Sequence, residues 1–311
     1  MNNRPAKILL YLAFIVNILV FGSSWMFNKM VLQEGVPPIW GAAMRQSIAA
    51  LVFLIVFLIK RPKLNLSKKH IILIVIYGVF MMALGHIFSF YGQQHIESGL
   101  ASIIFSFFPL AVILISAILI PKKEPLTLRK IAGTVLGFAG IVLLFYTQNM
   151  LGSGTTQLLG IVFVLISVFV NSIPNVIIKR DGAELDPLIL NTGGFLIASI
   201  LLLSTAFIVE GAPNFALTKQ LIFAELYLGI ICSAVGFFLY FWLMRYISVF
   251  KLALTAYMTP LVAIFLGYVF YNEILSLNHY IGMLLIFTGI FITEIKYRGK
   301  HANKDIRLKG R

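Results

Sequence analysis

Long apolar runs constrain the fold of this chain more than any other feature of its sequence. Ten of them follow one another with short polar connections, and each has about the 20 residues that a helix needs to cross a bilayer. They lie at 8–29, 38–59, 70–92, 98–120, 128–147, 157–179, 187–209, 222–245, 250–271 and 279–296. Because lipid offers no hydrogen-bond partners to the backbone, such runs satisfy their backbone groups as helices. The sequence therefore predicts an all-α integral membrane protein with ten transmembrane helices.

The composition excludes an ordinary soluble domain. Of the 311 residues, 60% are hydrophobic and 12% are charged, whereas soluble domains contain about 25% charged residues. The net charge of +14 raises the question of a nucleic-acid partner. The basic residues, however, stand between and beyond the apolar runs. We therefore expect the lipid bilayer, and no nucleic acid, as a partner of this chain.

The basic residues alternate between the two sides of the predicted membrane. The N-terminus, the C-terminal segment and the connections after the second, fourth, sixth and eighth runs together hold 22 Lys and Arg residues. The opposite connections hold Lys219, with Lys29 at the end of a run. Since the side rich in Lys and Arg faces the cytoplasm, we predict a multi-pass protein of the cell membrane with both termini cytoplasmic.

The chain consists of two related halves. Landmark residues of the first half recur at offsets of 150 or 151, namely Lys29 and Lys179, Pro37 and Pro187, Gly85 and Gly236, Ile96 and Ile247, and Pro109 and Pro260. Each half contains five runs, and an odd number places the second half upside down relative to the first. We predict a 5+5 inverted-topology repeat around a central cavity, with halves at 1–150 and 151–298 and a basic cytoplasmic tail at 299–311.

Several motifs carry a family resemblance that covers nearly the whole chain. They are GSSWMFNKMVLQEGVPP (22–38), IESGLASIIFSFFP (96–109), its counterpart ISVFKLALTAYMTP (247–260), and a glutamate followed by two glycines in each half (Glu124, Gly133 and Gly140; Glu273, Gly282 and Gly289). With these motifs the chain resembles the EamA-type half-repeat of the drug/metabolite transporter superfamily. The resemblance implies ten spans in a 5+5 inverted repeat, a central cavity, and movement of small metabolites, often outward. The second half departs at Asn175, where a counterpart of Trp25 would stand.

Polar side chains within the predicted spans indicate a lined cavity. Such groups are costly in lipid and usually face the interior of a helix bundle. His86, Ser89 and Gln93, for example, are spaced to share one helix face. Together with other polar and aromatic residues they predict a site for a small-molecule substrate, formed by Asn17, Trp25, Arg45, His86, Ser89, Gln93, Ser106, Asn171, Asn175, Tyr240, Thr255 and Tyr257. For any one of them, a hydrogen bond between helices is the alternative role.

Four residues leave specific alternatives open. Arg45, the only basic residue well inside a run, either binds an anionic group or extends toward water and caps carbonyl groups. His86 either titrates near neutral pH or serves as a hydrogen-bond partner. Pro109 and Pro260 interrupt helices, and each acts either as a hinge or gate or as a static kink.

The sequence predicts no enzyme, cofactor or metal site. It has no Walker loop, no H-E-x-x-H motif, no paired carboxylates and no Ser/His/Asp set. Acidic residues are also absent from the middle of the runs, where Glu225 and Glu294 come closest. Because proton-coupled pumps commonly use membrane carboxylates, we favour facilitated transport, exchange, or coupling through His86.

We therefore expect a carrier that moves small polar or amphipathic metabolites, such as amino acids, their derivatives or drugs. It would work by alternating access, in the outward direction. The alternative is a membrane-embedded enzyme or a lipid flippase that uses His70, Lys68 and Lys69 at the cytoplasmic surface. The sequence is compatible with a monomer and with a homodimer.

Overall fold

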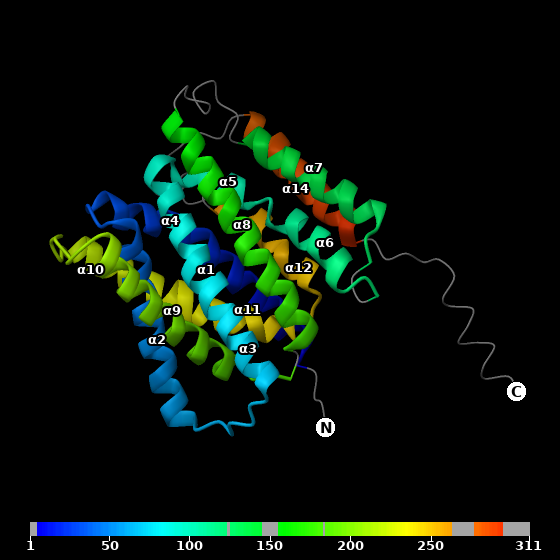
Figure 1. Ribbon diagram of the computed structural model, residues 1–311. Coiled ribbons are helices and arrows are strands. Elements are labelled where there is room, and N and C mark those ends of the chain that lie inside the picture. Colours follow the sequence, from blue (N-terminus) through cyan, green and yellow to red (C-terminus); the bar gives the residue numbers. More distant parts are fainter. Residues whose placement is uncertain (1–4, 123–124, 145–154, 183, 263–276, 295–311) are drawn as a thin grey trace, which may run out of the picture.

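Helices make up all of the regular structure in the residues that the structure describes. These residues are 5–122, 125–144, 155–182, 184–262 and 277–294 of a computed structural model (Figure 1). Within them, seven helices are long and apolar enough to cross a membrane: α1 (Lys7–Gln33), α2 (Pro38–Lys60), Lys68–His95, Ser98–Leu119, α8 (Thr155–Asp181), α9 (Pro187–Val209) and Lys219–Met244. Three shorter helical segments are α7 (Leu128–Leu144), Val249–Val262 and α14 (Leu277–Glu294).

These ten helical segments coincide with the ten predicted runs, so the expectation of an all-helical chain is confirmed. The three shorter segments adjoin residues outside the described ranges. The ends of the predicted spans 128–147, 250–271 and 279–296 lie outside the described residues. So do Glu124, Glu273 and the tail 299–311.

Two of the long helices change their winding at equivalent places. Lys68–His95 consists of α3 (Lys68–Ile76), the π-helical η1 (Tyr77–Leu84) and α4 (Gly85–His95). Lys219–Met244 likewise consists of α10 (Lys219–Leu226), the π-helical η2 (Tyr227–Val235) and α11 (Gly236–Met244). The two π-helical stretches begin 150 residues apart, at Tyr77 and Tyr227. Such stretches are rare and often lie at functional sites, so their recurrence supports the duplication read from the sequence.

A break divides Ser98–Leu119 just before its proline. α5 (Ser98–Phe105) ends, a two-residue turn follows, and α6 (Phe108–Leu119) carries Pro109 in its first turn. A proline at this place removes no helical hydrogen bond, because the first amides of a helix have no partner within it. Pro109 therefore lies in the first turn of a new helix, whereas the sequence suggested a bend within a continuous one.

Pro260 occupies a different position from its counterpart. α12 (Val249–Ala253) ends at a turn at Leu254, and residues 255–262 are again helical, so Pro260 lies inside that helix. A proline inside a helix leaves the carbonyl four residues earlier without its amide donor. That carbonyl belongs to Ala256, and it accepts hydrogen bonds from Ser106 Oγ at 3.1 Å and Thr259 Oγ1 at 3.0 Å. The bond from Ser106 joins the two breaks across the halves.

Side chains from elsewhere in the chain hold the start of α2. The amides of Ile39 and Trp40 each donate to a carboxylate oxygen of Glu210, at 2.9 Å. Because Glu210 follows α9 in the other half, the sequence around the start of α2 does not predict this cap. The corresponding helix α9 is capped locally, since Asp186 Oδ1 accepts from the Leu188 amide at 2.7 Å.

The closest helix packing joins one half of the chain to the other. α2 lies against α9, α7 against α14, α4 against α8, and α1 against α11. Figure 1 shows α7 and α14 side by side at one edge of the bundle. Their backbones touch at glycines, because a Cβ added to Gly289 would lie 2.5 Å from the Gly133 carbonyl oxygen. Small residues that permit such close approach stabilise helix pairs in membranes.

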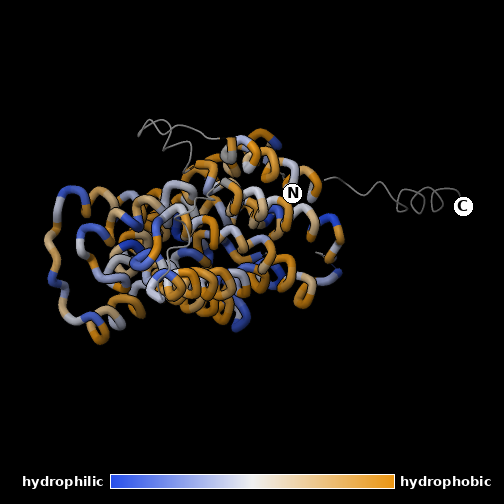
Figure 2. Tube along the Cα trace, turned by 90° about the horizontal axis from the view of Figure 1, so that it is seen from above, coloured by the Kyte–Doolittle hydropathy of each residue, from blue (hydrophilic) through white to orange (hydrophobic). Residues whose placement is uncertain are grey.

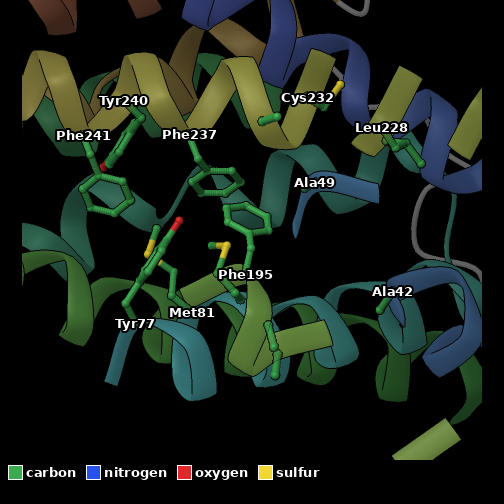
Figure 3. Close-up of a cluster of buried hydrophobic side chains, with 14 of the residues drawn as sticks. Ala42, Ala49, Tyr77, Met81, Phe195, Leu228, Cys232, Phe237, Tyr240 and Phe241 are labelled. Carbon is green, nitrogen blue, oxygen red and sulfur yellow. The ribbon is translucent and has the colours of Figure 1, made fainter. Parts of the chain in front are cut away.

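A cluster of aromatic side chains fills the interior between η1, α9 and α11 (Figure 3). The ring of Tyr77 lies 4.9 Å from that of Phe241, and the ring of Phe195 lies 5.8 Å from that of Phe237. The Tyr77 hydroxyl donates to Asn191 Oδ1 at 2.8 Å, so its polar end is also satisfied. This cluster connects the two halves on one side of the cavity described below.

Large apolar side chains also cover the outside of the bundle. Ile208, for instance, is 83% exposed on α9, and Figure 2 shows hydrophobic residues on helices throughout the bundle, including those at its edge. A soluble protein would rarely expose so much apolar surface. The distribution is that of a multi-pass integral membrane protein with lipid around it.

Candidate functional site

A cavity of about 110 Å³ lies between the two halves. We call it the central cavity and define it by its lining residues. The first half contributes Phe21, Ser24, Trp25, Asn28, Arg45, Met81, Gly85, His86, Ser89, Phe105 and Phe108, and the second half contributes Ser167, Asn171, Phe237, Tyr240, Thr255, Ala256 and Thr259. A space of this size holds several water molecules, which suits a small solute.

The structure brings seven of the twelve sequence-predicted site residues to the central cavity. They come from five long helices and from Val249–Val262, so helices distant in sequence converge on one space. The seven are Trp25, Arg45, His86, Ser89, Asn171, Tyr240 and Thr255.

Three other predicted residues form hydrogen bonds between helices beside the cavity. Asn17 Nδ2 donates to the Gly236 carbonyl oxygen at 2.8 Å and so ties α1 to α11. Asn175 Nδ2 donates to the Tyr240 hydroxyl oxygen at 2.6 Å. The Tyr257 hydroxyl donates to the Thr134 carbonyl oxygen at 2.6 Å. For these three, the structure favours the alternative role of holding helices together.

The last two predicted residues lie away from the lining as well. Ser106 Oγ donates to the carbonyl oxygens of Ser102, at 2.8 Å, and Ala256, at 3.1 Å, next to the break before Pro109. Gln93 is fully buried, and neither polar atom of its side chain has a hydrogen-bond partner among the described residues. Its main-chain oxygen accepts from Lys29 Nζ at 3.3 Å.

The sequence did not single out the apolar wall of the cavity. This wall consists of Phe21, Met81, Phe105, Phe108 and Phe237. The ring of Phe105 lies 5.3 Å from that of Trp25, and the ring of Phe21 lies 5.1 Å from that of Phe237. With 27 phenylalanines in the chain, residue type alone does not separate those facing the cavity from those facing lipid. A usable signal exists for Phe105 and Phe108, which flank the break beside Pro109.

Arg45 turns inward and does not extend toward water. Its side chain is among the buried ones, with 3% of the residue exposed. Nε donates to Ser233 Oγ at 2.8 Å, and one Nη donates to Asn28 Oδ1 at 3.0 Å. No carboxylate among the described residues forms an ion pair with it within 4 Å. The guanidinium has five N–H donors, and these two bonds use two of them.

His86 has one ring nitrogen engaged. Nδ1 lies 3.3 Å from the Met81 carbonyl oxygen in the π-helical η1, and because a carbonyl only accepts, Nδ1 is the donor. The ring also lies 6.2 Å from that of Phe237. These contacts fit the role of a hydrogen-bond partner that orients the cavity wall.

Two lysines at equivalent positions hold the ends of the helices beside the cavity. Lys29 Nζ donates to the carbonyl oxygens of Gln93 and Ile96, both at 3.3 Å, where α4 ends. Lys179 Nζ donates to those of Met244 and, at 2.7 Å, Ile247, where α11 ends. A cation at the carbonyl end of a helix is stabilising. The lysines lie four residues after Trp25 and Asn175, about one helical turn further along α1 and α8.

Each half of the chain matches the same known family. Residues 8–146 and 158–295 match the EamA-like transporter family. The chain is similar to "Uncharacterized transporter YoaV" of Bacillus subtilis, with 27% identity over 280 residues that cover 90% of this chain and 94% of the relative. "Uncharacterized transporter YvbV" of the same organism is 28% identical over 298 residues, or 94% of this chain and 93% of the relative. A crystal structure of another protein superimposes with a TM-score of 0.75 at 19% identity, covering 93% of this chain and 97% of that one.

Proposed function

We propose that this chain, which belongs to the EamA-like transporter family, exports small polar or amphipathic metabolites across the cell membrane by alternating access. Membership of this family makes the protein a membrane transporter and not an enzyme. The solutes that we propose are amino acids, their derivatives and comparable amphipathic drugs.

The proposed architecture is a pair of five-helix halves, 1–150 and 151–298, inserted in opposite orientations and followed by the tail 299–311. Both termini would then lie in the cytoplasm. The repeated π-helical stretches, the repeated lysine contacts and the packing of each first-half helix on a second-half helix support this arrangement. Such pseudo-symmetry gives a chain two nearly equivalent states, one open to each side.

The observation that carries this function is the composition of the central cavity. Both halves line it, so any rocking of one half against the other changes its access. Aromatic rings form most of its apolar wall, and Arg45 presents a cation with further N–H donors beside it. An apolar wall with a few convergent polar groups is the usual form of a small-molecule site. We infer that the preferred solute has an apolar body and a carboxylate or similar anionic group.

The alternative of a flippase or enzyme at the cytoplasmic surface gains no support from the residues on which it depends. Lys69 Nζ lies 3.0 Å from Asp181 Oδ1. His70 and Ser67 cap α3, since the His70 amide donates to Ser67 Oγ at 3.3 Å. These side chains serve the ends of helices, and a carrier remains the function that the cavity favours.

The test is solute counterflow in proteoliposomes with a panel of phenylalanine, leucine, glutamate, citrate and choline. We expect saturable exchange of at least one carboxylate-bearing solute. Ser89→Trp, which fills the cavity, should abolish this exchange, and the control Leu51→Trp, at a position that is 58% exposed on α2, should preserve it. Absence of saturable exchange for the whole panel, with transfer of a fluorescent phospholipid instead, would establish the flippase alternative.

A further inference from the structure

Glu225 is a buried carboxylic acid that the proposed transport route does not use. It lies on α10 with 4% of the residue exposed. Neither of its carboxylate oxygens has a hydrogen-bond partner among the described residues. An ionised carboxylate without partners is strongly unfavourable in a low-dielectric interior. Its position therefore requires a nearby cation, a bound proton, or each of these in turn.

The cation close to Glu225 is Arg45, the residue that also faces the central cavity. Arg45 is seven residues into α2 and Glu225 is six residues into α10, and these two helices are in contact. The segment after α10 also approaches α2 closely, because a Cβ at Gly229 would lie 3.2 Å from the Arg45 carbonyl oxygen. The two charges interact electrostatically, but they do not form an ion pair within 4 Å.

One other charged side chain lies at the start of α10: Glu34, directly after α1, accepts from Thr218 Oγ1 at 2.5 Å, seven residues before Glu225. From η2 come the thiol of Cys232, which donates to the Val20 carbonyl oxygen at 3.3 Å, and the hydroxyl of Tyr227, which lies 2.8 Å from Ser23 Oγ. Cys232 is the titratable group of η2 that interacts with Arg45. The charged group of α1 that approaches the cavity region is Lys29, and it is engaged at the end of α4. Among the described residues, Glu225 thus experiences essentially one charge, that of Arg45.

We propose that Glu225 is the proton-binding group that couples solute movement to proton movement, with Arg45 shared between its carboxylate and the anionic group of the solute. This rests on the transport function proposed above. In the empty carrier, the ionised Glu225 balances the charge of Arg45. When an anionic group enters and binds the free N–H donors of Arg45, Glu225 takes up one proton. The buried site then keeps the same net charge.

The consequence is co-transport of one proton with each anionic group. When the solute leaves, the proton of Glu225 leaves on the same side, and the ionised Glu225 again balances the charge of Arg45. Export of a solute down its own gradient would thus carry protons outward, and an inward proton gradient would favour uptake. In the sequence Glu225 lies near the start of an apolar run and not at its middle, but its burial in the same region as Arg45 gives it the properties of a coupling residue.

The first test asks whether Glu225 changes its protonation, and it needs no solute. Infrared difference spectra of the full-length protein in detergent micelles would be recorded across a pH titration. We expect a carbonyl-stretch band of a protonated buried carboxyl that titrates in the wild type and in Glu225→Asp, and that is absent from Glu225→Gln. The control Glu97→Gln changes a side chain that is 83% exposed, and it should keep the band. Identical titrations of Glu225→Gln and wild type would overturn the proposal.

The second test measures protons and solute together in proteoliposomes that contain a pH-sensitive dye. Phenylalanine is the probe, because it combines a carboxylate with an aromatic body. We expect proton movement with phenylalanine in the wild type, and phenylalanine movement without protons in Glu225→Gln. Equal proton movement in the two proteins would refute the coupling role. If no panel solute moves at all, the proposed transport function fails, whereas the infrared titration still decides the role of Glu225.

Discussion

Asn175 Nδ2 and the Tyr240 hydroxyl oxygen lie 2.6 Å apart and join α8 to α11 by a hydrogen bond. Their counterparts in the first half, at offsets of 150 and 151, are Trp25 and Ser89. Both counterparts line the central cavity, and no hydrogen bond connects them. The two halves therefore differ at this place: a hydrogen bond joins Asn175 to Tyr240 but none joins Trp25 to Ser89, and the Trp25 ring lies 5.3 Å from that of Phe105 instead.

Tyr240→Phe removes the bond to Asn175 with little change of shape. We expect the cavity to become more accessible from the side of Lys179, because nothing then ties α8 to α11 at this level. A cysteine introduced at Asn171, in a background where Cys232, the single cysteine of the chain, is replaced by Ser, would report this access. Its labelling by a membrane-impermeant maleimide in inverted vesicles should increase several-fold.

The matched control for this experiment is Tyr257→Phe. Tyr257 is likewise buried and forms a hydrogen bond of 2.6 Å, in which its hydroxyl is the donor, but it lies outside the cavity lining. Its substitution should leave the labelling unchanged. If both variants raise the labelling equally, the hydrogen bond between Asn175 and Tyr240 does not control access to the cavity.

Lys29→Met and Lys179→Met should have opposite effects on the balance between the two access states. Each lysine holds the end of the helix beside it, and in an inverted repeat the two contacts lie on opposite sides of the membrane. Loss of either contact should favour opening on its own side. Labelling of the Asn171 cysteine from outside in cells and from inside in inverted vesicles measures this balance. A shift of both variants in the same direction would contradict the pseudo-symmetric arrangement.

Arg45→Lys should weaken solute binding although it keeps the positive charge. Lysine cannot reproduce the fork of donors that bonds Ser233 and Asn28 and still presents N–H groups to the cavity. We expect KM for phenylalanine counterflow to rise about tenfold, which corresponds to roughly 1.4 kcal/mol. The control is Arg61→Lys, at an exposed position after α2. An unchanged KM in Arg45→Lys would remove the guanidinium from the solute site.

Gly289→Ala should destabilise the pair of α7 and α14. The added methyl group would lie 2.5 Å from the Gly133 carbonyl oxygen and 2.6 Å from the Gly137 amide nitrogen, so the helices must separate. Overpacking of this kind costs about 1–3 kcal/mol of the free energy of unfolding. The midpoint of thermal unfolding in detergent should fall accordingly. The control Val142→Ala, at an exposed position of α7, should barely change the midpoint. Equal midpoints for Gly289→Ala and the wild type would show that the contact between α7 and α14 accommodates a methyl group without loss of stability.

The sequence alone determined that the chain is helical, where its helical segments lie, and that its two halves are related. Lipid demands runs of a certain length with satisfied backbones, and the repeated landmarks from Lys29 to Pro260 are properties of the linear chain. For the same reason the sequence also indicated that polar residues would gather inside the bundle, since exposure of Asn171 or His86 to lipid is unfavourable.

Only the tertiary structure decided which of those polar residues face the cavity. Asn17, Asn175 and Tyr257 each find a partner on another helix, and a sequence contains no record of which helix that is. The electrostatic interaction of Arg45 with Glu225 also depends on packing, because the two residues are 180 positions apart in the sequence. Helix periodicity tells which residues share a face, but packing in three dimensions decides what that face meets. The environment of each buried charge, and hence its chemistry, follows from that packing.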